Sequence, residues 1–172
     1  AKLYKIAAHA GAGVLEIFER RLQDPDERVA KAVVWVMCEF DEPKAMDILK
    51  QAIRHESEGI RVEGIRAMSA CRGSAGGQLI VASLDDISIP VREAAFRAIA
   101  SLKAETAIPK LGAMASEKDF FFRNLENRIK AIETLGAIGS PAALPYLEKI
   151  AGGRAFRKQT KELKETAAAA VY

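Results

Sequence analysis

The residues that could do chemistry are few and scattered along the chain. His55 precedes Glu56, but no second histidine or cysteine stands at metal-ligand spacing from it. Gly76 and Gly77 lack the Lys-Ser/Thr that follows the glycines of a phosphate-binding loop. Cys71 falls on a repeating apolar position, which favours a small core residue over a nucleophile. The sequence therefore predicts no enzyme, no catalytic residue, no metal site and no cofactor.

Composition sets broad limits on the class of protein. The chain has 172 residues, 49% of them apolar and 28% charged, which is typical of one soluble domain. Its net charge of +3 is too small to indicate nucleic-acid binding. Two cysteines make no disulfide framework and fit a reducing compartment, so we predict a cytoplasmic protein. There is no membrane-length apolar run, and the ends at Ala1 and Tyr172 suggest a fragment of a longer chain.

A repeat of 31 residues organises the sequence. Apolar residues return at this interval, as in Leu49, Ile80 and Leu111 and in Val29, Ile60 and Val91. Beyond residue 116 the interval becomes 36, which implies a five-residue insertion between units. The predicted units are 1-23, 24-54, 55-85, 86-116, 117-152 and a truncated 153-172. The truncated end would expose an apolar face and favour end-to-end association of the isolated fragment.

Each unit reads as two helices joined by a short break. Apolar residues occur at helical spacing, and Pro43 and Pro141 follow residues that commonly start helices. Strand signals are absent from the pattern. A single helix pair cannot bury its apolar face, so neighbouring pairs must complete the core. The sequence predicts an all-α, right-handed solenoid of about five antiparallel helix pairs plus a truncated unit.

The first helices carry an apolar-Arg-x-x-Ala-x-x-Ala-Leu pattern, seen at residues 60–68 and 91–99, with a close version that runs from Arg128 to Gly139. This pattern resembles the HEAT repeat family, and more narrowly the short bacterial HEAT units of the phycobilisome-lyase type. The resemblance implies an armadillo-like helical array whose second helices line a concave surface. Ala30 departs from the pattern, because it stands where the family has arginine.

The missing catalytic motifs and the chemistry of the groove positions predict a non-catalytic scaffold or adaptor that binds another protein or peptide segment through this groove. Outward positions of the second helices change from charged to small and apolar along the array. The candidate contact residues are Lys50, Arg54, Gln78, Val81, Ala82, Pro109 and Ala113. An equally weighted alternative is that small residues only allow a tight inner curve. No membrane partner is predicted.

Basic residues of the first helices form a row with the same repeat interval. Arg61, Arg92, Arg128 and Lys164 occupy this row, and Asp24, Asp86 and His55 are candidate partners at the unit starts. Such pairs in stacked repeats mainly fix geometry, so we interpret the row as structural rather than as a ligand ladder.

Trp35 falls on an outward position, because its repeat equivalents are Arg66, Arg97 and Glu133. Two interpretations follow: it stacks on Arg66 of the next unit, or it is an independent hot spot for a partner. Intramolecular packing is the favoured interpretation.

The two insertions combine aromatic and basic residues. A nucleic-acid interface could use Arg123, Arg154, Arg157 and Lys158 together with the neighbouring phenylalanines. The favoured interpretation of the run Phe120-Phe121-Phe122 is a plug between units, since three exposed phenylalanines would be costly. A chromophore-lyase function is a third, weaker hypothesis.

Overall fold

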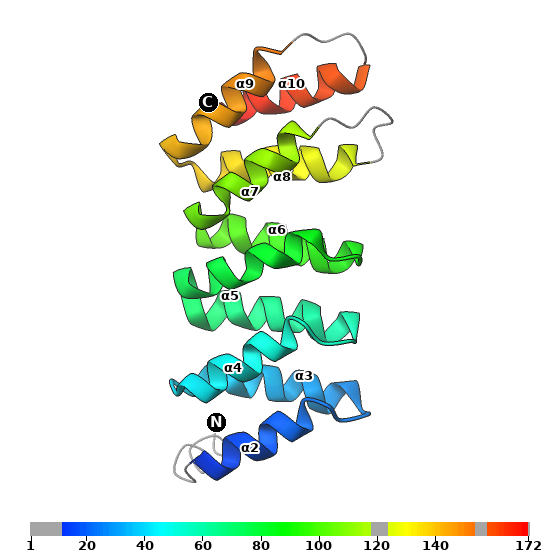
Figure 1. Ribbon diagram of the computed structural model, residues 1–172, viewed down its shortest axis with the longest axis vertical. Helices are drawn as coiled ribbons and strands as arrows, with labels where there is room; N and C mark the ends of the chain where they lie inside the picture. The colour runs from blue at the N-terminus through cyan, green and yellow to red at the C-terminus, as the bar shows by residue number, and fades with distance from the viewer. Residues whose placement is uncertain (1–11, 118–123, 154–157, 172) are drawn as a thin grey trace. The chain divides into compact units, whose positions relative to one another are not determined.

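The computed structural model describes residues 12–117, 124–153 and 158–171, and these form helices joined by short connections, with no strand (Figure 1). The all-α solenoid of HEAT-type helix pairs is therefore confirmed. The chain divides into two compact units, residues 1–95 and 96–172, and the boundary falls inside helix α6 (Ile89–Leu102). Within the described residues, no helix has the length and apolar character needed to cross a bilayer.

The first compact unit contains the repeats that carry the candidate site. Its elements, in chain order, are α2 (Ala12–Arg21), α3 (Glu27–Val36), the 3-10 turn η1 (Met37–Glu39), α4 (Pro43–Ala52), α5 (Glu58–Ile80) and the 3-10 turn η2 (Val81–Asp85). Helix α5 packs on both α3 and α4, so that successive helix pairs lie against each other.

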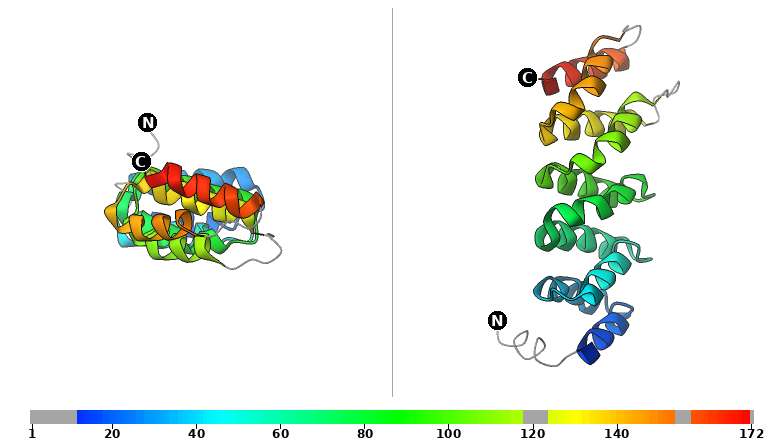
Figure 2. Two further views of the ribbon diagram at one scale, coloured as in Figure 1. Left: turned by 90° about the horizontal axis from the view of Figure 1, so that it is seen from above. Right: turned by 60° about the vertical axis from the view of Figure 1, so that its left-hand side comes forward.

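The second compact unit repeats the same design. After α6 it contains η3 (Glu105–Ala107), α7 (Ile108–Ser116), α8 (Leu125–Ile138), η4 (Pro141–Ala143), α9 (Leu144–Ala151) and α10 (Lys158–Val171). Within this unit, α8 packs on α10 and α7 on α9, which gives a layer of first helices and a layer of second helices (Figure 2).

Local chemistry fixes several helix ends. The Asp26 side chain accepts from the backbone N–H of Arg28 at the start of α3, and Ser57 accepts from Ile60 at the start of α5. Gly139 ends α8 with φ +66°, a left-handed conformation that favours glycine. The prediction of a side-chain cap before Pro43 is wrong, because Glu42 makes no capping hydrogen bond.

Helix α5 does not run straight from Glu58 to Ile80 but contains a sharp turn. A Cβ placed on Gly76 would lie 2.6 Å from the carbonyl oxygen of Met68. In a straight helix these two residues would be about 12 Å apart along the axis. The chain therefore folds back within α5 (Figure 1), which supplies both helices of the predicted 55-85 unit.

The core follows the 31-residue repeat. Leu49, Ile80 and Leu111 are each fully buried, as the repeat predicts. Val29 is the exception, because it is 36% exposed while its neighbour Ala30 is fully buried. Burial of Ala30 removes no charge from water, whereas burial of the arginine that stands at this position in the later units would. The prediction that Cys71 is a core residue is also wrong, because its side chain is half-buried.

Candidate functional site

The turns that open three successive repeats share one hydrogen-bond pattern. The side chains of Asp24, His55 and Asp86 each accept from the backbone N–H two residues later, at 2.9, 3.0 and 2.8 Å respectively. In His55 the acceptor is Nδ1, so the proton of the neutral ring lies on Nε2, which then donates to the Gln23 side chain at 3.2 Å. His55 thus replaces an aspartate without changing the turn.

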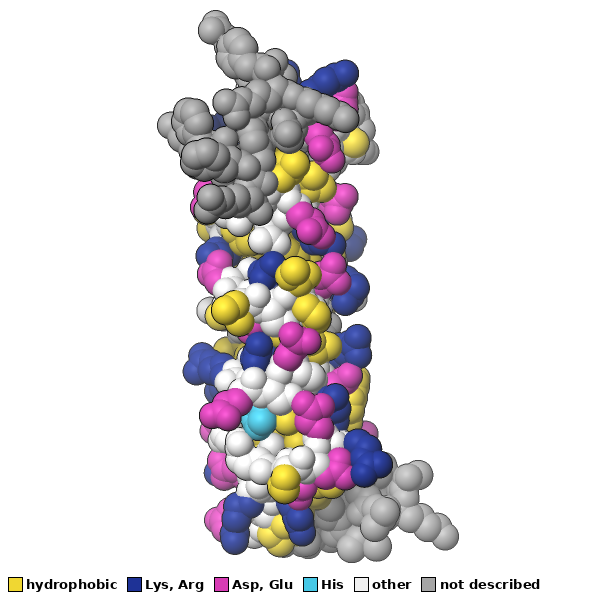
Figure 3. Space-filling model, turned by 90° about the vertical axis from the view of Figure 1, so that its right-hand side faces the viewer, with side chains coloured by type: hydrophobic (Ala, Val, Ile, Leu, Met, Phe, Trp, Pro, Cys, Tyr) yellow, Lys and Arg dark blue, Asp and Glu magenta, His cyan; other side chains and the backbone are white. Residues whose placement is uncertain are grey.

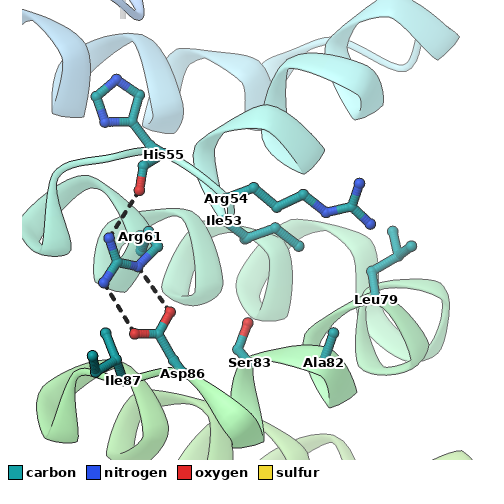
Figure 4. A pocket seen from close by; sticks show the side chains of 9 residues that line it. All are labelled: Ile53, Arg54, His55, Arg61, Leu79, Ala82, Ser83, Asp86 and Ile87. Atoms are coloured by element: carbon teal, nitrogen blue, oxygen red, sulfur yellow. Dashed lines mark hydrogen bonds and ion pairs between the residues drawn. The ribbon is translucent and has the colours of Figure 1, made fainter.

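Arg61 joins two of these turns. Its guanidinium binds the Asp86 carboxylate at 2.9 and 3.0 Å and donates to the carbonyl oxygen of His55 (Figure 4). It also donates to the carbonyl oxygen of Glu56. Arg92 repeats the second half of this pattern, since it donates to the carbonyl oxygens of Asp86 and Ile87. The predicted structural pairing of Arg61 with Asp86 is confirmed.

The preceding repeat lacks this arginine–aspartate bridge. Ala30 occupies the repeat position of Arg61, and His55 occupies that of Asp86. Both partners of the bridge are therefore replaced together, and neither replacement leaves an unpaired buried charge. A second contact between the same repeats is kept, because Ser57 donates to Glu27 just as Ser88 donates to Glu58.

Two hollows lie beside these turns. The polar hollow has a volume of about 380 Å³ and is lined by Gln23, Lys50, Gln51, Arg54, His55 and Glu56. The apolar-walled hollow has a volume of about 350 Å³ and is lined by Ile53, Arg54, His55, Arg61, Leu79, Ala82, Ser83, Asp86 and Ile87. Gln51, His55 and Glu56 of the first hollow correspond, 31 residues later, to Ala82, Asp86 and Ile87 of the second. The two hollows therefore lie at equivalent positions of successive repeats, and they differ in the chemistry of the residues that line them.

Arg54 lines both hollows, together with His55. Its side chain is exposed, and its guanidinium makes no hydrogen bond or ion pair with the residues that the structure describes. In Figure 4 it extends away from the Arg61–Asp86 pair, toward the side on which Leu79 and Ala82 lie. By contrast, Lys50 of the polar hollow binds Asp47 at 2.9 Å. Arg54 is therefore the cation at this edge that is available to a ligand.

Charge of both signs surrounds the hollows. On the face drawn in Figure 3, basic and acidic side chains are interspersed, and hydrophobic side chains appear between them. A ligand is therefore selected by individual contacts and not by a broad field of one sign.

Gln51 ties the polar hollow to helix α2. Its amide donates to Glu19 at 2.6 Å, and Lys44 forms an ion pair with the same carboxylate. The hydrogen bond from Lys44, followed by that from Gln51, holds the pKa of Glu19 below its usual 4.5. The stabilisation from this group is present above the unfolded-state pKa and is lost as pH falls through the folded-state pKa.

Replacing Lys44 with alanine should raise the pKa of Glu19 toward its ordinary value. The reason is that the largest contribution to the lowered pKa, the Lys44 hydrogen bond, is removed. An NMR titration of the side-chain carboxyl carbon measures this pKa directly. Lys31→Ala is the control, because Lys31 binds Glu27 and should leave Glu19 unchanged. An unaltered Glu19 titration in Lys44→Ala would contradict the assignment.

The predicted contact residues fall into two groups. Lys50, Arg54 and Ala82 line the hollows, while Gln78 is exposed on α5 and Val81 is half-buried at the start of η2. Pro109 and Ala113 are exposed on α7 of the second compact unit. Partner binding by these residues stays a prediction. Gln23 and Ile87 were not predicted from the sequence, although the 31-residue repeat places Ile87 at the position equivalent to Glu56.

Trp35 contacts the next repeat differently from the predicted stacking. Its ring is 43% exposed, and its indole N–H donates to Glu63 at 3.1 Å. Glu63 also binds Arg66 at 2.8 Å, so its carboxylate bridges the two residues. The predicted intramolecular packing of Trp35 is therefore supported, with Glu63 as its partner in place of a stacked Arg66. Arg123, Arg154 and Arg157, the phenylalanine run and the Lys158 side chain lie outside the described residues.

Among the described residues, no group of three or more histidine, cysteine, aspartate or glutamate side chains is placed to hold a metal.

The repeats match a known family over most of the chain. The family model described as HEAT repeats matches residues 14–86 and 78–170. The chain therefore belongs to the HEAT repeat family, as its arginine-containing first helices indicate. No curated protein sequence matches it.

Two solved structures share the fold. Human deoxyhypusine hydroxylase, solved in complex with glycerol, is 23% identical with a TM-score of 0.57, over 97% of this chain and 65% of that chain. An engineered protein is 17% identical with a TM-score of 0.52, over 96% of this chain and 82% of that chain. This chain thus spans about two thirds of the hydroxylase, and at these identities the likeness shows the fold alone.

The predicted function, a non-catalytic scaffold or adaptor, is wrong as an inference from the fold. Deoxyhypusine hydroxylase is an enzyme, and it has the same kind of helical array. A HEAT array therefore carries catalytic as well as binding functions, because function depends on the site rather than the fold. The comparisons support neither a nucleic-acid-binding function nor a chromophore lyase.

Proposed function

We propose that the two hollows form a binding site for a ligand that carries a carboxylate beside an aliphatic group. The observation that carries this proposal is Arg54, which lines both hollows and has no partner among the described residues. The proposal concerns binding, and it applies equally to a substrate and to a stable partner.

A carboxylate is the best match for Arg54. The planar guanidinium donates two parallel hydrogen bonds to a carboxylate, a geometry that the chain itself shows between Arg61 and Asp86. The other cations that line the hollows are already paired, Arg61 with Asp86 and Lys50 with Asp47. An incoming carboxylate would therefore bind Arg54 without breaking an existing ion pair.

The aliphatic part of the ligand is indicated by the wall of the second hollow. Ile53, Leu79 and Ala82 line this wall, and Ile87 stands at its edge with 94% of its surface exposed. Covering apolar surface contributes about 25 cal/mol for each Å² removed from water. An aliphatic group that covers Ile87 is therefore favoured over a polar one. The volumes of both hollows fall in the range of about 300–1,000 Å³ that is usual for ligand sites.

Two sources could supply this chemistry: a free small carboxylic acid, or an acidic side chain in a segment of another protein. A protein segment bound here would place its aspartate or glutamate at Arg54 and its aliphatic side chain against Ile53, Leu79 and Ala82. Another protein or peptide segment thus stays part of the proposal.

The cellular setting is also a proposal. We place the chain in a bacterial cytoplasm, and the absence of a disulfide between Cys38 and Cys71, both of which the structure describes, supports a reducing compartment. The division into six units also stays a prediction.

Replacing Arg54 with alanine should weaken carboxylate binding at least tenfold. Removing a hydrogen-bonded charged partner costs about 1.5–3 kcal/mol, which corresponds to roughly 10- to 150-fold in affinity. The first probe is a peptide selected from phage-displayed random decapeptides, and the second is isovalerate. Fluorescence anisotropy and calorimetry, respectively, give the two affinities.

The two probes separate the two sources. Peptide enrichment in acidic-plus-aliphatic motifs supports a protein segment, and binding of isovalerate alone supports a small acid. Arg28→Ala is the matched control, because Arg28 is exposed and binds Asp26 away from the hollows. Failure of both probes to bind, or equal binding by wild type and Arg54→Ala, would refute the proposed function.

A further inference from the structure

We infer that Cys38 and Cys71 form a reversible oxidation site, at which a peroxide converts the two thiols into one disulfide. This inference concerns a different part of the first compact unit, and it is independent of the carboxylate site.

The two sulfur atoms converge on a single acceptor. Cys38 lies in η1 and Cys71 in α5, yet both thiols donate to the carbonyl oxygen of Ala67, at 3.6 and 2.9 Å. The sulfurs therefore cannot be farther apart than the sum of these two distances. The bond from Cys71 is the ordinary contact of a helical residue with the preceding turn. The bond from Cys38 comes from a different element, so packing of η1 on α5 creates the pair.

A disulfide between Cys38 and Cys71 would require both sulfurs to leave the Ala67 carbonyl oxygen. Closing the bond brings the two sulfurs to about 2.05 Å and the two Cβ atoms to about 3.8 Å. Rotation about the two Cα–Cβ bonds would have to carry each sulfur from the Ala67 carbonyl oxygen toward the other sulfur.

Both thiols are accessible to a small oxidant. Each cysteine is half-buried, and neither forms a disulfide in this structure. Partial exposure admits a peroxide molecule, while the neighbouring second thiol favours a disulfide over further oxidation of the first.

The reaction balances with hydrogen peroxide as the oxidant. One cysteine thiolate attacks a peroxide oxygen, the O–O bond breaks, and after protonation the products are a sulfenic acid and water. The second cysteine sulfur then attacks the sulfenic sulfur. The S–S bond forms, the S–O bond breaks, and the hydroxide leaves as a second water with the thiol proton. In sum, two thiols lose two electrons and two protons, and one peroxide becomes two waters.

The disulfide would connect η1, at the bend between α3 and α4, to the following helix α5. It would therefore link two successive repeats covalently, where the reduced protein relies on packing. Closing a loop of this length restricts the unfolded chain, so oxidised protein should unfold at a higher urea concentration than reduced protein.

The experiment treats the full chain with a small excess of hydrogen peroxide, alkylates it with iodoacetamide and measures its intact mass. The expected result is a monomer about 2 Da lighter with no alkylation, because two hydrogens are removed. Since the chain has two cysteines, this mass assigns the bond to Cys38 and Cys71. Dithiothreitol should restore both alkylation sites.

Two variants provide the matched controls. Cys38→Ser and Cys71→Ser should each accumulate a sulfenic acid that dimedone traps, whereas the wild type should not. The inference would be overturned by a wild type that gains oxygen atoms instead of losing hydrogens. A disulfide-linked dimer as the main product would overturn it as well.

Discussion

Arg61→Ala is expected to lower the free energy of unfolding by about 3 kcal/mol, near the low end of the values for breaking a buried ion pair. The side chains of Arg61 and Asp86 are only 13% and 15% exposed. Truncation leaves the Asp86 carboxylate largely out of water, with the Ser88 backbone N–H still donating to it. It also removes the donor to the carbonyl oxygens of His55 and Glu56. Urea denaturation monitored by circular dichroism measures the change.

Arg28 provides the matched control for this prediction. It makes the same type of arginine–aspartate pair, with Asp26 at 2.8 Å, but its side chain is 89% exposed. Solvent screens such a pair, so Arg28→Ala should change stability by no more than the error of the measurement. A similar loss in both variants would contradict the structural role given to the Arg61–Asp86 bridge.

Gly64→Ala should destabilise the protein by about 1–3 kcal/mol, the usual cost of overpacking. A Cβ at this position would lie 2.9 Å from the backbone nitrogen of Ile53 and 3.0 Å from the carbonyl carbon of Ala52. Backbone atoms cannot rotate away as a flexible side chain can, so α4 and α5 must separate. A thermal or urea melt reports the loss.

The same substitution at Gly13 should have the opposite sign. Gly13 lies in α2, and a Cβ there would meet no atom of the described residues within 4 Å. Alanine favours a helix over glycine by up to about 1 kcal/mol, so Gly13→Ala should be neutral or stabilising. If Gly64→Ala were equally neutral, the close approach of α4 and α5 at Gly64 would be incorrect.

The repeat was predictable from sequence because apolar spacing is a local, one-dimensional signal. Leu49, Ile80 and Leu111 occupy matching buried places, as their spacing of 31 residues predicts. The Arg61–Asp86 bridge was predictable for the same reason, since both residues keep the repeat interval. Family membership follows from these positions, but function does not, because arrays with the same pattern include an enzyme.

The candidate site could not be predicted in full, because it depends on distances between turns. Lys50, Arg54 and Ala82 were named from their outward positions, yet the sequence gives no sign that Lys50 is paired and Arg54 is not. The joint replacement at Ala30 and His55 is visible in the sequence. The structure was needed to see its consequence, which is a turn that keeps its geometry without the arginine bridge.

The most direct test of the account is an NMR titration of the isotopically labelled chain with isovalerate and with a selected acidic decapeptide. At least one probe should shift the amide signals of the two hollows, around Gln51, Arg54, His55 and Ile87, and in Arg54→Ala the same shifts should require at least tenfold more of that probe. Shifts centred on Trp35 and Glu63, or no shifts with either probe, would contradict the account.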